Sequence, residues 1–440
     1  MKLYLYMLLI SISVILPSCT SDRSGEATEV DEEIETPFST ELVAIAGNDD
    51  LMLPANFNVA VVIDSTPKPA RHITVRDNGD IYIKSGSDKS NSILALRDSD
   101  GDGTIDAQAG FGKYKGTGIG IYNGYLYASS NTEVFRYKLK EGELLPDTIP
   151  ETIVSGFPDQ GQHASKPFTF DNDGNIYVNV GAPSNACMEQ MRSAGSKGVD
   201  PCPQLEWQAS IWRFKADQPG QTQQKDGYKY CTGVRNCVAL DWDQNTNSLY
   251  AAVHGRDQLA SFWPDLYTNE QNAELPAEEL LQIDAEDDFG WPYCFYDQFQ
   301  EKKILAPEYG GDGKELGRCA EKKNPLVAFP GHLAPNDLLF YTGDQFPDHY
   351  KNGAFIAFHG SWNRAPLPQK GYFVAFVPFT NGQPSGDWEI FADGFSRLEE
   401  VENPSDAVHR PVGLSQGPNG SLYVSDSMKG KVWRISYGSS

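Results

Sequence analysis

The segment DNGDIYIK (residues 77–84) is the clearest copy of a unit that recurs along the chain, in which a turn rich in Asn, Asp and Gly precedes a short strand containing tyrosine. The Asn-Gly step tolerates the positive φ of a tight hairpin turn, and the residues after it alternate with the period of two that a strand requires. Each copy therefore predicts a β-hairpin. Further copies are NGYLYAS (123–129), DNDGNIYVNV (171–180), DQNTNSLYAAV (243–253), GPNGSLYVSD (417–426) and, more loosely, KNGAFIAF (351–358).

The spacing of these hairpins indicates the architecture. Their aromatic anchors lie 45 to 105 residues apart, so the shorter spacings match the length of a propeller blade and the longer ones leave room for insertions. The sequence predicts an all-β fold, a six-bladed β-propeller, with a β-sandwich of several hairpins as the alternative. Only PAEELLQI (276–283) is a candidate for a short turn or helix. The anchors are Tyr82, Tyr127, Tyr177, Tyr250, Phe355 and Tyr423.

The N-terminus has the pattern of an export signal. Residues 1–18 contain Lys2 and an apolar run, and they end at Cys19 in a sequence that resembles a lipoprotein processing site. We expect residues 19–38, which are polar and acidic, to be a flexible tether with a lipidated Cys19, and residues 39–440 to form the propeller. The chain would be an exported bacterial lipoprotein on the periplasmic or cell-surface face of the membrane, attached only by its lipid. An ordinary secretory peptide with a free cysteine is the alternative.

The chain carries a large excess of acidic residues. Sixty Asp and Glu against 36 Lys and Arg give a formal net charge of -24 at pH 7. This charge repels phosphate backbones, so the sequence argues against nucleic-acid binding.

Apart from Cys19, the cysteines form an even set in a chain that is expected to be exported, where disulfides persist. Sequential pairing would close three short loops, although six cysteines allow other connectivities. A zinc site is the alternative, with little support because no C-x-x-C pair occurs. The expected pairs are Cys187 with Cys202, Cys231 with Cys237, and Cys294 with Cys319.

The segment RDSDGDGTIDA (97–107) spaces acidic residues as an oxygen-ligand calcium loop does. Position twelve of such a loop is Ala109 instead of a bidentate Glu, so the motif is incomplete. A calcium loop and an ordinary Asp/Gly-rich hairpin tip are both open. The candidate ligands are Asp98, Asp100, Asp102 and Asp106.

No nucleotide-binding motif accounts for the chemistry. The chain has no G-x-G-x-x-G and no P-loop, so an all-β chain leaves its chemistry to residues at the mouth of the propeller channel. Polar stretches rich in His and Arg are the candidates. They are HASKPFTF (163–170), CTGVRN (231–236), AVHGRDQL (252–259), FHGSWNR (358–364) and HRPVG (409–413).

These stretches, in this order, resemble those of the PQQ-dependent glucose and sorbosone dehydrogenases, including the fungal PQQ-dependent pyranose dehydrogenases. DDFGWPYC (287–294) and APNDLLFYTGDQFP (334–347) extend the resemblance over most of the chain from about residue 50 to 438. It implies a six-bladed propeller that oxidises a sugar or a sugar-derived alcohol or aldehyde. Hydride would pass to PQQ and electrons to a separate acceptor, a quinone or a cytochrome.

The resemblance also implies roles for particular residues. His163 matches the histidine that acts as general base on the sugar hydroxyl, a task that suits a neutral imidazole. Because PQQ carries three carboxylates, guanidinium groups are expected around it. The expected cofactor contacts are Arg71, Arg235, Asn236, His254, Arg256 and Arg410, each of which could instead be a structural or solvated side chain.

Calcium is the second cofactor that the resemblance implies. It would be bound through backbone carbonyls at Gly255 and Arg256, since carbonyl oxygens suit a hard cation. Where glucose dehydrogenases have Gln and Pro beside this glycine, His254 and Arg256 stand here, so sorbosone dehydrogenases are the better match. The Leu-Lys cofactor contact of the glucose dehydrogenases falls near FHGSWNR, where a contact to the quinone from the present residues or a purely structural turn are both open. The candidates for this contact are His359, Trp362, Asn363 and Arg364.

Two other classes of protein stay open at this level. A non-catalytic propeller could use calcium for rigidity and bind a glycan or a protein, and failure to bind PQQ would favour it. A propeller lactonase could use calcium to activate water, and activity without a redox acceptor would point to it.

Overall fold

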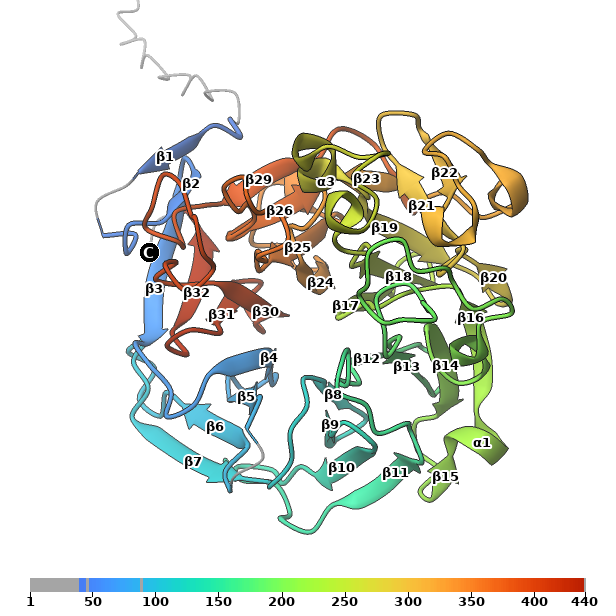
Figure 1. Cartoon of the computed structure of the whole chain (residues 1–440). Coiled ribbons are helices and arrows are strands. Elements are labelled where there is room, and N and C mark those ends of the chain that lie inside the picture. Colours follow the sequence, from blue (N-terminus) through green and yellow to red (C-terminus); the bar gives the residue numbers. More distant parts are fainter. Residues whose placement is uncertain (1–38, 45–46, 88–89, 439–440) are drawn as a thin grey trace, which may run out of the picture. The chain divides into compact units, whose positions relative to one another are not determined.

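The computed structural model describes residues 39–44, 47–87 and 90–438, whose principal strands form six sheets arranged around a central axis (Figure 1). Four of these sheets have four strands and two have a fifth, short strand at the outer edge. The prediction of an all-β, six-bladed propeller is confirmed. The expected signal peptide, Cys19 and the tether lie outside the described residues.

In each blade the strands follow one another antiparallel from the axis outward, as in a meander. The first blade consists of β4 (Ala70–Val75), β5 (Ile81–Ser85), β6 (Ile93–Arg97) and β7 (Ala107–Phe111). The second consists of β8 (Ile119–Tyr122), β9 (Tyr125–Ser129), β10 (Val134–Lys138) and β11 (Glu151–Ser155), with β15 (Gln221–Thr222) added in parallel. The third consists of β12 (Phe168–Phe170), β13 (Asn175–Val180), β14 (Ser210–Lys215) and β16 (Tyr228–Thr232), with β20 (Asp287–Asp288) added in parallel.

The fourth blade consists of β17 (Ala239–Asp243), β18 (Ser248–Val253), β19 (Glu278–Ile283) and β23 (Val327–Phe329). The fifth consists of β24 (Pro335–Phe340), β25 (Ala354–Phe358), β26 (Phe373–Val377) and β29 (Glu389–Ala392). The sixth contains β30 (Pro411–Gln416), β31 (Leu422–Asp426) and β32 (Val432–Tyr437), and its outer strand is β3 (Phe57–Ile63) from the other end of the chain. Because β3 pairs with β32, both ends of the chain contribute strands to the sixth blade, and this pairing closes the ring of blades.

The six aromatic anchors of the sequence all lie on the second strand of their blades. Three of them also join neighbouring blades. The hydroxyls of Tyr82, Tyr127 and Tyr250 donate to the carbonyls of Leu144 (2.9 Å), Ala216 (2.9 Å) and Gly382 (2.8 Å), each of which lies beyond the third strand of the next blade. The tyrosine that marks the unit in the sequence therefore fills the core and satisfies its own buried hydroxyl.

Side chains on the inner strands form a second set of links around the axis. Asp241 accepts from the backbone N–H of Phe340 (2.9 Å), and Asp337 accepts from that of Leu414 (2.7 Å). Ser415 accepts from the N–H of Val75 (3.0 Å). Each bond joins one inner strand to the next, so these buried polar groups stabilise the ring of blades. Burial without a cation raises the pKa of Asp241 to about 7 and that of Asp337 to about 8.

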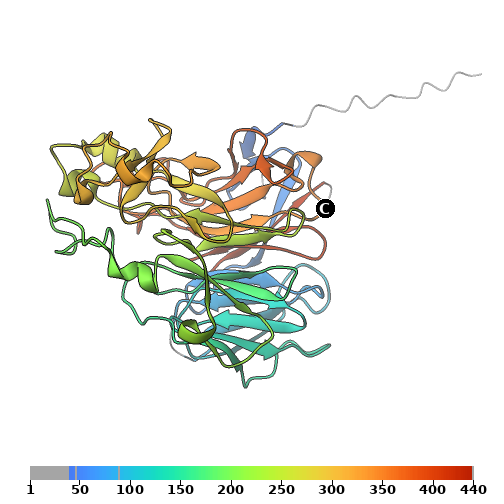
Figure 2. The same ribbon diagram turned by 90° about the vertical axis from the view of Figure 1, so that its right-hand side faces the viewer.

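Two long insertions project from the same face of the propeller and contact each other (Figure 2). One runs between β13 and β14, and the other between β19 and β23. The Tyr309 hydroxyl contacts the Ala186 carbonyl at 3.2 Å, and the N–H of Gly198 donates to the Glu308 carbonyl (2.9 Å). Disulfides Cys187–Cys202 and Cys294–Cys319 close one loop within each insertion, as predicted. The insertions contain η1 (Pro203–Glu206), β21 (Cys294–Asp297), β22 (Lys302–Leu305), η2 (Pro307–Tyr309) and η3 (Gly317–Cys319).

The predicted third disulfide is wrong, because Cys231 and Cys237 are both free thiols in the structure. Cys231 lies in β16, paired opposite Ile211 of β14, and the Cys237 thiol donates to the Asn179 side-chain oxygen at 3.2 Å. The strand pairing and this hydrogen bond fix both side chains in the apolar core between the third and fourth blades. Burial raises the pKa of both thiols, so neither has thiolate character.

The candidate for a short turn or helix at 276–283 is also wrong, since Glu278–Ile283 is strand β19. The fourth blade needs a third strand between β18 and β23, and this segment pairs with both while burying Leu280 and Leu281. No helix of the described residues is long and apolar enough to cross a membrane. The remaining elements are β1 (Leu42–Ala44), β2 (Met52–Pro54), β27 (Phe379–Thr380), β28 (Gln383–Pro384), α1 (Gln223–Asp226), α2 (Leu259–Phe262), α3 (Asn269–Glu274) and η4 (Asp348–Tyr350).

We predict that a Cys19→Ser chain, denatured without reductant, contains two titratable thiols, which are Cys231 and Cys237. Thiol titration with a chromogenic disulfide measures this number directly. Peptide mapping should find the two disulfides within their insertions. A chain without any titratable thiol would restore the third disulfide and contradict the structure.

Candidate active site

Two adjoining cavities open at the end of the propeller where the inner strands begin. The first, which we call the axial cavity, has a volume of about 380 Å³ and is lined mainly by residues that precede or begin the inner strands of five blades. The second, the lateral cavity, has about 310 Å³ and extends toward the insertions. His163 and His254 line both cavities, so the two meet at these imidazoles. The axial cavity also contacts Arg71, Lys115, Thr117, Asn236 and Asn336, and the lateral cavity Arg192, Arg235, Gly255, Asp257, Glu278 and Trp362.

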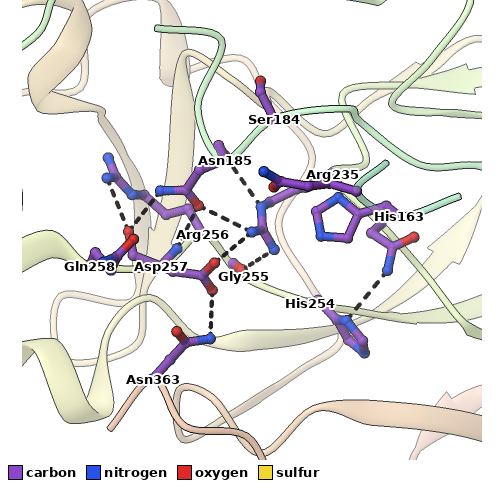
Figure 3. A network of polar contacts seen from close by, with 12 residues as sticks. His163, Ser184, Asn185, Arg235, His254, Gly255, Arg256, Asp257, Gln258 and Asn363 are labelled. Carbon is purple, nitrogen blue, oxygen red and sulfur yellow. Dashed lines mark hydrogen bonds and ion pairs between the residues drawn. The ribbon is translucent and has the colours of Figure 1, made fainter. Parts of the chain in front are cut away.

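Arg235 is the centre of the polar network beside the cavities (Figure 3). Its guanidinium is buried and donates to the Gly255 carbonyl (2.7 Å), the Asp257 carboxylate (2.9 Å) and the Asn185 side-chain oxygen (3.1 Å). Asp257 also accepts from Arg192 (3.1 Å), and its other oxygen accepts from Asn363 (3.0 Å). The two guanidiniums hold the pKa of Asp257 at about 2, against the opposing effect of burial.

The insertions supply the support for this network. Asn185 accepts from the N–H of Asp257 (2.8 Å), and its backbone carbonyl accepts from the Trp291 indole (2.9 Å). Arg256 turns away from both cavities and makes a two-oxygen ion pair with the buried Glu308 at 2.6 Å. The loop that carries His254 to Asp257 is therefore fixed from behind by the second insertion.

His163 has the properties expected of a general base. Its backbone has a φ of 48°, a left-handed conformation that is uncommon for a residue other than glycine and that often occurs at functional sites. Nδ1 lies 2.6 Å from the Ala182 carbonyl, which can only accept, so Nδ1 carries the proton and Nε2 has a free lone pair. No described residue hydrogen-bonds to Nε2. Burial and the charge of Arg235 lower the pKa of His163 to about 3, so the imidazole is neutral near pH 7.

His254 is fixed as a neutral imidazole in a similar way. Its Nε2 donates to the Pro335 carbonyl (2.7 Å), and its Nδ1 accepts from the Asn236 amide (3.4 Å). Burial lowers its pKa to about 4, with Arg235 adding to the effect. Both nitrogens of His254 are therefore occupied, whereas His163 keeps one acceptor free at the junction of the cavities.

The axial cavity is positive in a protein that is strongly negative overall. None of the described residues that line it is acidic, and Arg71 faces it without a hydrogen-bond or ion-pair partner among the described side chains. Lys84 and Lys166 are fully buried and donate to the carbonyls of Tyr114 (2.7 Å) and Ala164, which lie beside or in the cavity wall. Burial lowers the pKa of both lysines to about 7. The cavity is suited to a ligand that carries several negative charges.

Two of the expected cofactor contacts, His359 and Arg410, form hydrogen bonds with other residues of the chain. Arg410 donates to the His359 carbonyl (3.0 Å), to the His359 Nδ1 (2.9 Å) and to the Gly360 carbonyl (2.5 Å). His359 Nε2 lies 2.7 Å from the Ser427 hydroxyl. These contacts hold the turn that carries Trp362, which is itself exposed at the lateral cavity. Neither His359 nor Arg410 lines the two cavities.

The expected calcium sites have different geometries. The Gly255 carbonyl already accepts from Arg235, whose positive charge opposes a cation at this oxygen. The Asp-rich segment is the hairpin tip between β6 and β7, and carboxylate oxygens of Asp98, Asp100 and Asp106 lie within 4.8 Å of one another. Asp102 is not in this group and instead accepts from the N–H of Thr104 (2.8 Å). Calcium binding at either place stays a prediction.

Three residues of the network were not identified from the sequence: Asn185, Arg192 and Asp257. The sequence signal available for Asp257 was its position directly after Arg256 in the AVHGRDQL stretch. Asn185 and Arg192 belong to an insertion without a repeating pattern, and no local feature of the sequence indicates that it folds back onto Arg235.

Together these observations define a six-bladed propeller with a candidate small-molecule site at the end of its axis, in which a cationic cavity adjoins a neutral histidine. The chain belongs to the TrAA12-like family, whose profile matches residues 51–438. The resemblance to PQQ-dependent sugar dehydrogenases inferred from the motifs is confirmed by the relatives that follow.

The chain is similar to a pyrroloquinoline quinone-dependent pyranose dehydrogenase of Coprinopsis cinerea, with 35% identity over 242 residues. This match spans 46% of the chain but only 30% of the fungal protein. The holo form of the PQQ domain of Coprinopsis cinerea pyranose dehydrogenase has the same fold, with a TM-score of 0.71 at 20% identity over 88% of this chain and 97% of that one. A calcium structure of the Trichoderma reesei family AA12 enzyme gives a TM-score of 0.71 at 17% identity over 93% and 100% of the two chains.

We predict that Asp257→Asn lowers the free energy of unfolding by about 3 kcal/mol, because it leaves the buried Arg235 without a counter-charge. Denaturant unfolding of the full chain measures this change. Asp200→Asn is the matched control, since it breaks the exposed pair with Arg318 and should lower the free energy of unfolding far less. Equal effects of the two substitutions would show that Asp257 does not hold the network together.

Proposed function

We propose that this protein is a PQQ-dependent oxidoreductase that oxidises a sugar or a sugar-derived alcohol or aldehyde of the aldose or sorbosone type. The observation that carries the proposal is the unpartnered Arg71 guanidinium in a cationic cavity, directly beside a histidine with a free acceptor nitrogen. The names of the Coprinopsis cinerea relatives support the same cofactor and substrate class.

The residues of the axial cavity fit PQQ. Its three carboxylates need cationic and hydrogen-bonding partners, and the cavity offers Arg71 and Lys115 together with the neutral donors Thr117, Asn236 and Asn336. When bound, PQQ supplies the acceptor for the hydride that leaves the substrate carbon. Arg235 is not free to grip a carboxylate with two hydrogen bonds, because Asn185, Gly255 and Asp257 already take most of its donors. Its role is to fix the loops and to add positive charge.

His163 would take the proton of the substrate hydroxyl. The Ala182 carbonyl holds the Nδ1–H, which fixes the tautomer and directs the lone pair of Nε2 toward the junction of the cavities. Because Arg235 and burial keep the imidazole neutral, it is ready to accept a proton without first losing one. A positioned base of this kind contributes roughly 10²–10⁴-fold to a proton-transfer step.

We also propose an electron acceptor and a location for this protein. Electrons would leave to a separate quinone or cytochrome, since the chain contains no C-x-x-C-H haem motif. The protein would be exported and attached to the membrane by a lipid on Cys19. Calcium at Gly255 stays part of the proposal, and its carbonyl oxygen would have to be shared with the Arg235 guanidinium.

We expect Arg71→Ala to weaken PQQ binding by roughly ten- to hundredfold, the range for losing hydrogen bonds between charged groups. Isothermal titration of PQQ into the full chain measures the dissociation constant. Arg76→Ala is the matched control, because Arg76 follows the same inner strand at its other end and donates to the Lys140 carbonyl (3.0 Å). Absence of PQQ binding by the unchanged protein would overturn the proposal and favour a non-catalytic propeller.

His163→Ala should keep the PQQ affinity of the unchanged protein and lose roughly 10²–10⁴-fold in turnover. In the unchanged protein, His163 should produce no fall in kcat/KM between pH 8 and pH 5, because its pKa of about 3 keeps it neutral over this range. Dye-linked assays over a panel of sugars measure both effects. His349→Ala, at a surface histidine paired with Glu389, is the control. Turnover that survives in His163→Ala would remove this residue from the mechanism.

A further inference from the structure

A third cavity, which we call the channel cavity, lies along the propeller axis between the inner strands β4, β8, β12, β17, β24 and β30 (Figure 1). It has a volume of about 270 Å³ and shares no lining residue with the axial or the lateral cavity. Arg71 and Asn336 line the axial cavity, whereas the next residues, His72 and Asp337, line the channel cavity. Its ionisable and aromatic lining residues are His72, Tyr122, Phe168, Phe170, Asp241 and Asp337.

The channel cavity is acidic, in contrast to the axial cavity. None of the described residues that line it is Lys or Arg. Asp241 has no ion-pair partner in the described part of the chain, and the one described basic side chain within 4 Å of the Asp337 carboxylate is His72, at 3.8 Å. Burial lowers the pKa of His72 to about 4, so its imidazole is neutral near pH 7. Two carboxyl groups therefore face the cavity without a counter-charge.

Both carboxyl groups are held in fixed orientations and keep acceptor capacity. Asp337 accepts the backbone N–H groups of Leu338 (3.0 Å) and Leu414 (2.7 Å), one at each oxygen. Asp241 accepts two backbone N–H groups in the same way, at 2.9 Å each, and the Thr169 hydroxyl at 3.3 Å. Because an ionised carboxylate offers about four lone pairs, each of the two keeps at least one for a ligand.

His72 supplies a third acceptor. Its Nε2 lies 2.7 Å from the Asn336 carbonyl, which can only accept, so Nε2 carries the proton and Nδ1 has a lone pair. His72 is only 6% exposed, and no described residue hydrogen-bonds to its Nδ1. A buried acceptor without a partner is costly unless a ligand or water satisfies it. Because the imidazole lines the cavity, Nδ1 is available to a ligand there.

The three acceptor side chains fit an organic ammonium group better than a bare metal ion. Their ligand atoms do not all lie within 4.8 Å of one another, whereas those of the Asp-rich hairpin tip do. Tyr122, Phe168 and Phe170 line the same cavity, and the Tyr122 and Phe170 rings stack with centroids 4.7 Å apart. Aromatic faces attract organic cations. A primary ammonium group has three N–H donors and no acceptor, which matches three acceptor side chains.

We propose that the channel cavity is a second ligand site, which binds a small molecule with a primary ammonium group. Its N–H donors would be directed to His72, Asp241 and Asp337, and its carbon chain would contact the aromatic rings. A quaternary ammonium ion lacks the donors and an alcohol lacks the charge, so neither matches the site. The proposed PQQ-dependent oxidation uses none of these three residues, so this inference is tested independently of it.

The first test compares three ligands by isothermal titration into the unchanged full chain: n-butylammonium, tetramethylammonium and n-butanol. Butylammonium should bind at least about tenfold more tightly than either of the others, the range for one hydrogen bond to a charged group. Equal binding of the two ammonium ions would reveal general attraction to an acidic protein and overturn the site, as would no binding. Displacement of butylammonium by an equal concentration of potassium ions would also overturn it, because the site would then bind inorganic cations.

The second test locates the site. Asp337→Asn and His72→Phe should each weaken butylammonium binding by about tenfold or more, because each removes one acceptor. Asp348→Asn is the matched control, since it removes the same charge from a side chain that is 95% exposed, and it should leave the dissociation constant unchanged. A thermal unfolding scan identifies any variant that does not fold, and the ligand comparison then decides. Folded variants that bind butylammonium like the unchanged protein would contradict the proposal.

Discussion

The buried ion pair between Arg235 and Asp257 is the interaction on which the site depends. Burying two charges costs several kcal/mol for each ion unless hydrogen bonds satisfy the remaining donors and acceptors. Here those partners come from distant parts of the chain: Asn185 from the first insertion, Gly255 from the loop after β18, and Asn363 from the turn after β25. The donors and acceptors of the pair are therefore fully satisfied only when all three segments are in place, which couples the stability of the pair to the assembly of the cavities.

The Arg235–Asp257 pair also explains why the two cavities differ in charge. Asp257 pairs with both Arg192 and Arg235, so each cation among the described residues that line the lateral cavity has an ionic partner. Arg71 has no such carboxylate in the described part of the chain, and the cationic character of the axial cavity follows from that difference. The positive charge of Arg235 also lowers the pKa of His163 and His254. Burial, with the charge of Arg235 adding to its effect, therefore keeps two imidazoles neutral at the junction where an anionic cofactor and the substrate would meet.

The fold was predictable because its signal is local. An Asn-Gly or Asp-Gly turn followed by an alternating strand needs only neighbouring residues to form, and all six anchors lie on the second strand of a blade. The errors arose where distant contacts decide the structure. Residues 278–283 are good helix formers, yet the blade requires a strand there, and tertiary packing overrides propensity. Cys231 and Cys237 are near in sequence, but strand pairing and the Asn179 contact hold their thiols apart from a disulfide.

The site itself was predictable to the extent that propeller geometry positions it. All inner strands begin at the same end of the axis, so residues just before or at their starts gather there although they are hundreds of positions apart. In this chain Arg71, Thr117, His163, Asn236 and Asn336 all lie 10 to 19 residues before the anchor of their blade, and all of them line the axial cavity. This rule needs only the repeat and requires no resemblance to a family. It does not identify Asn185, Arg192 or Trp362, because these residues come from segments outside the repeat, whose positions depend on the ion pair, the disulfides and the buried Arg256–Glu308 contact.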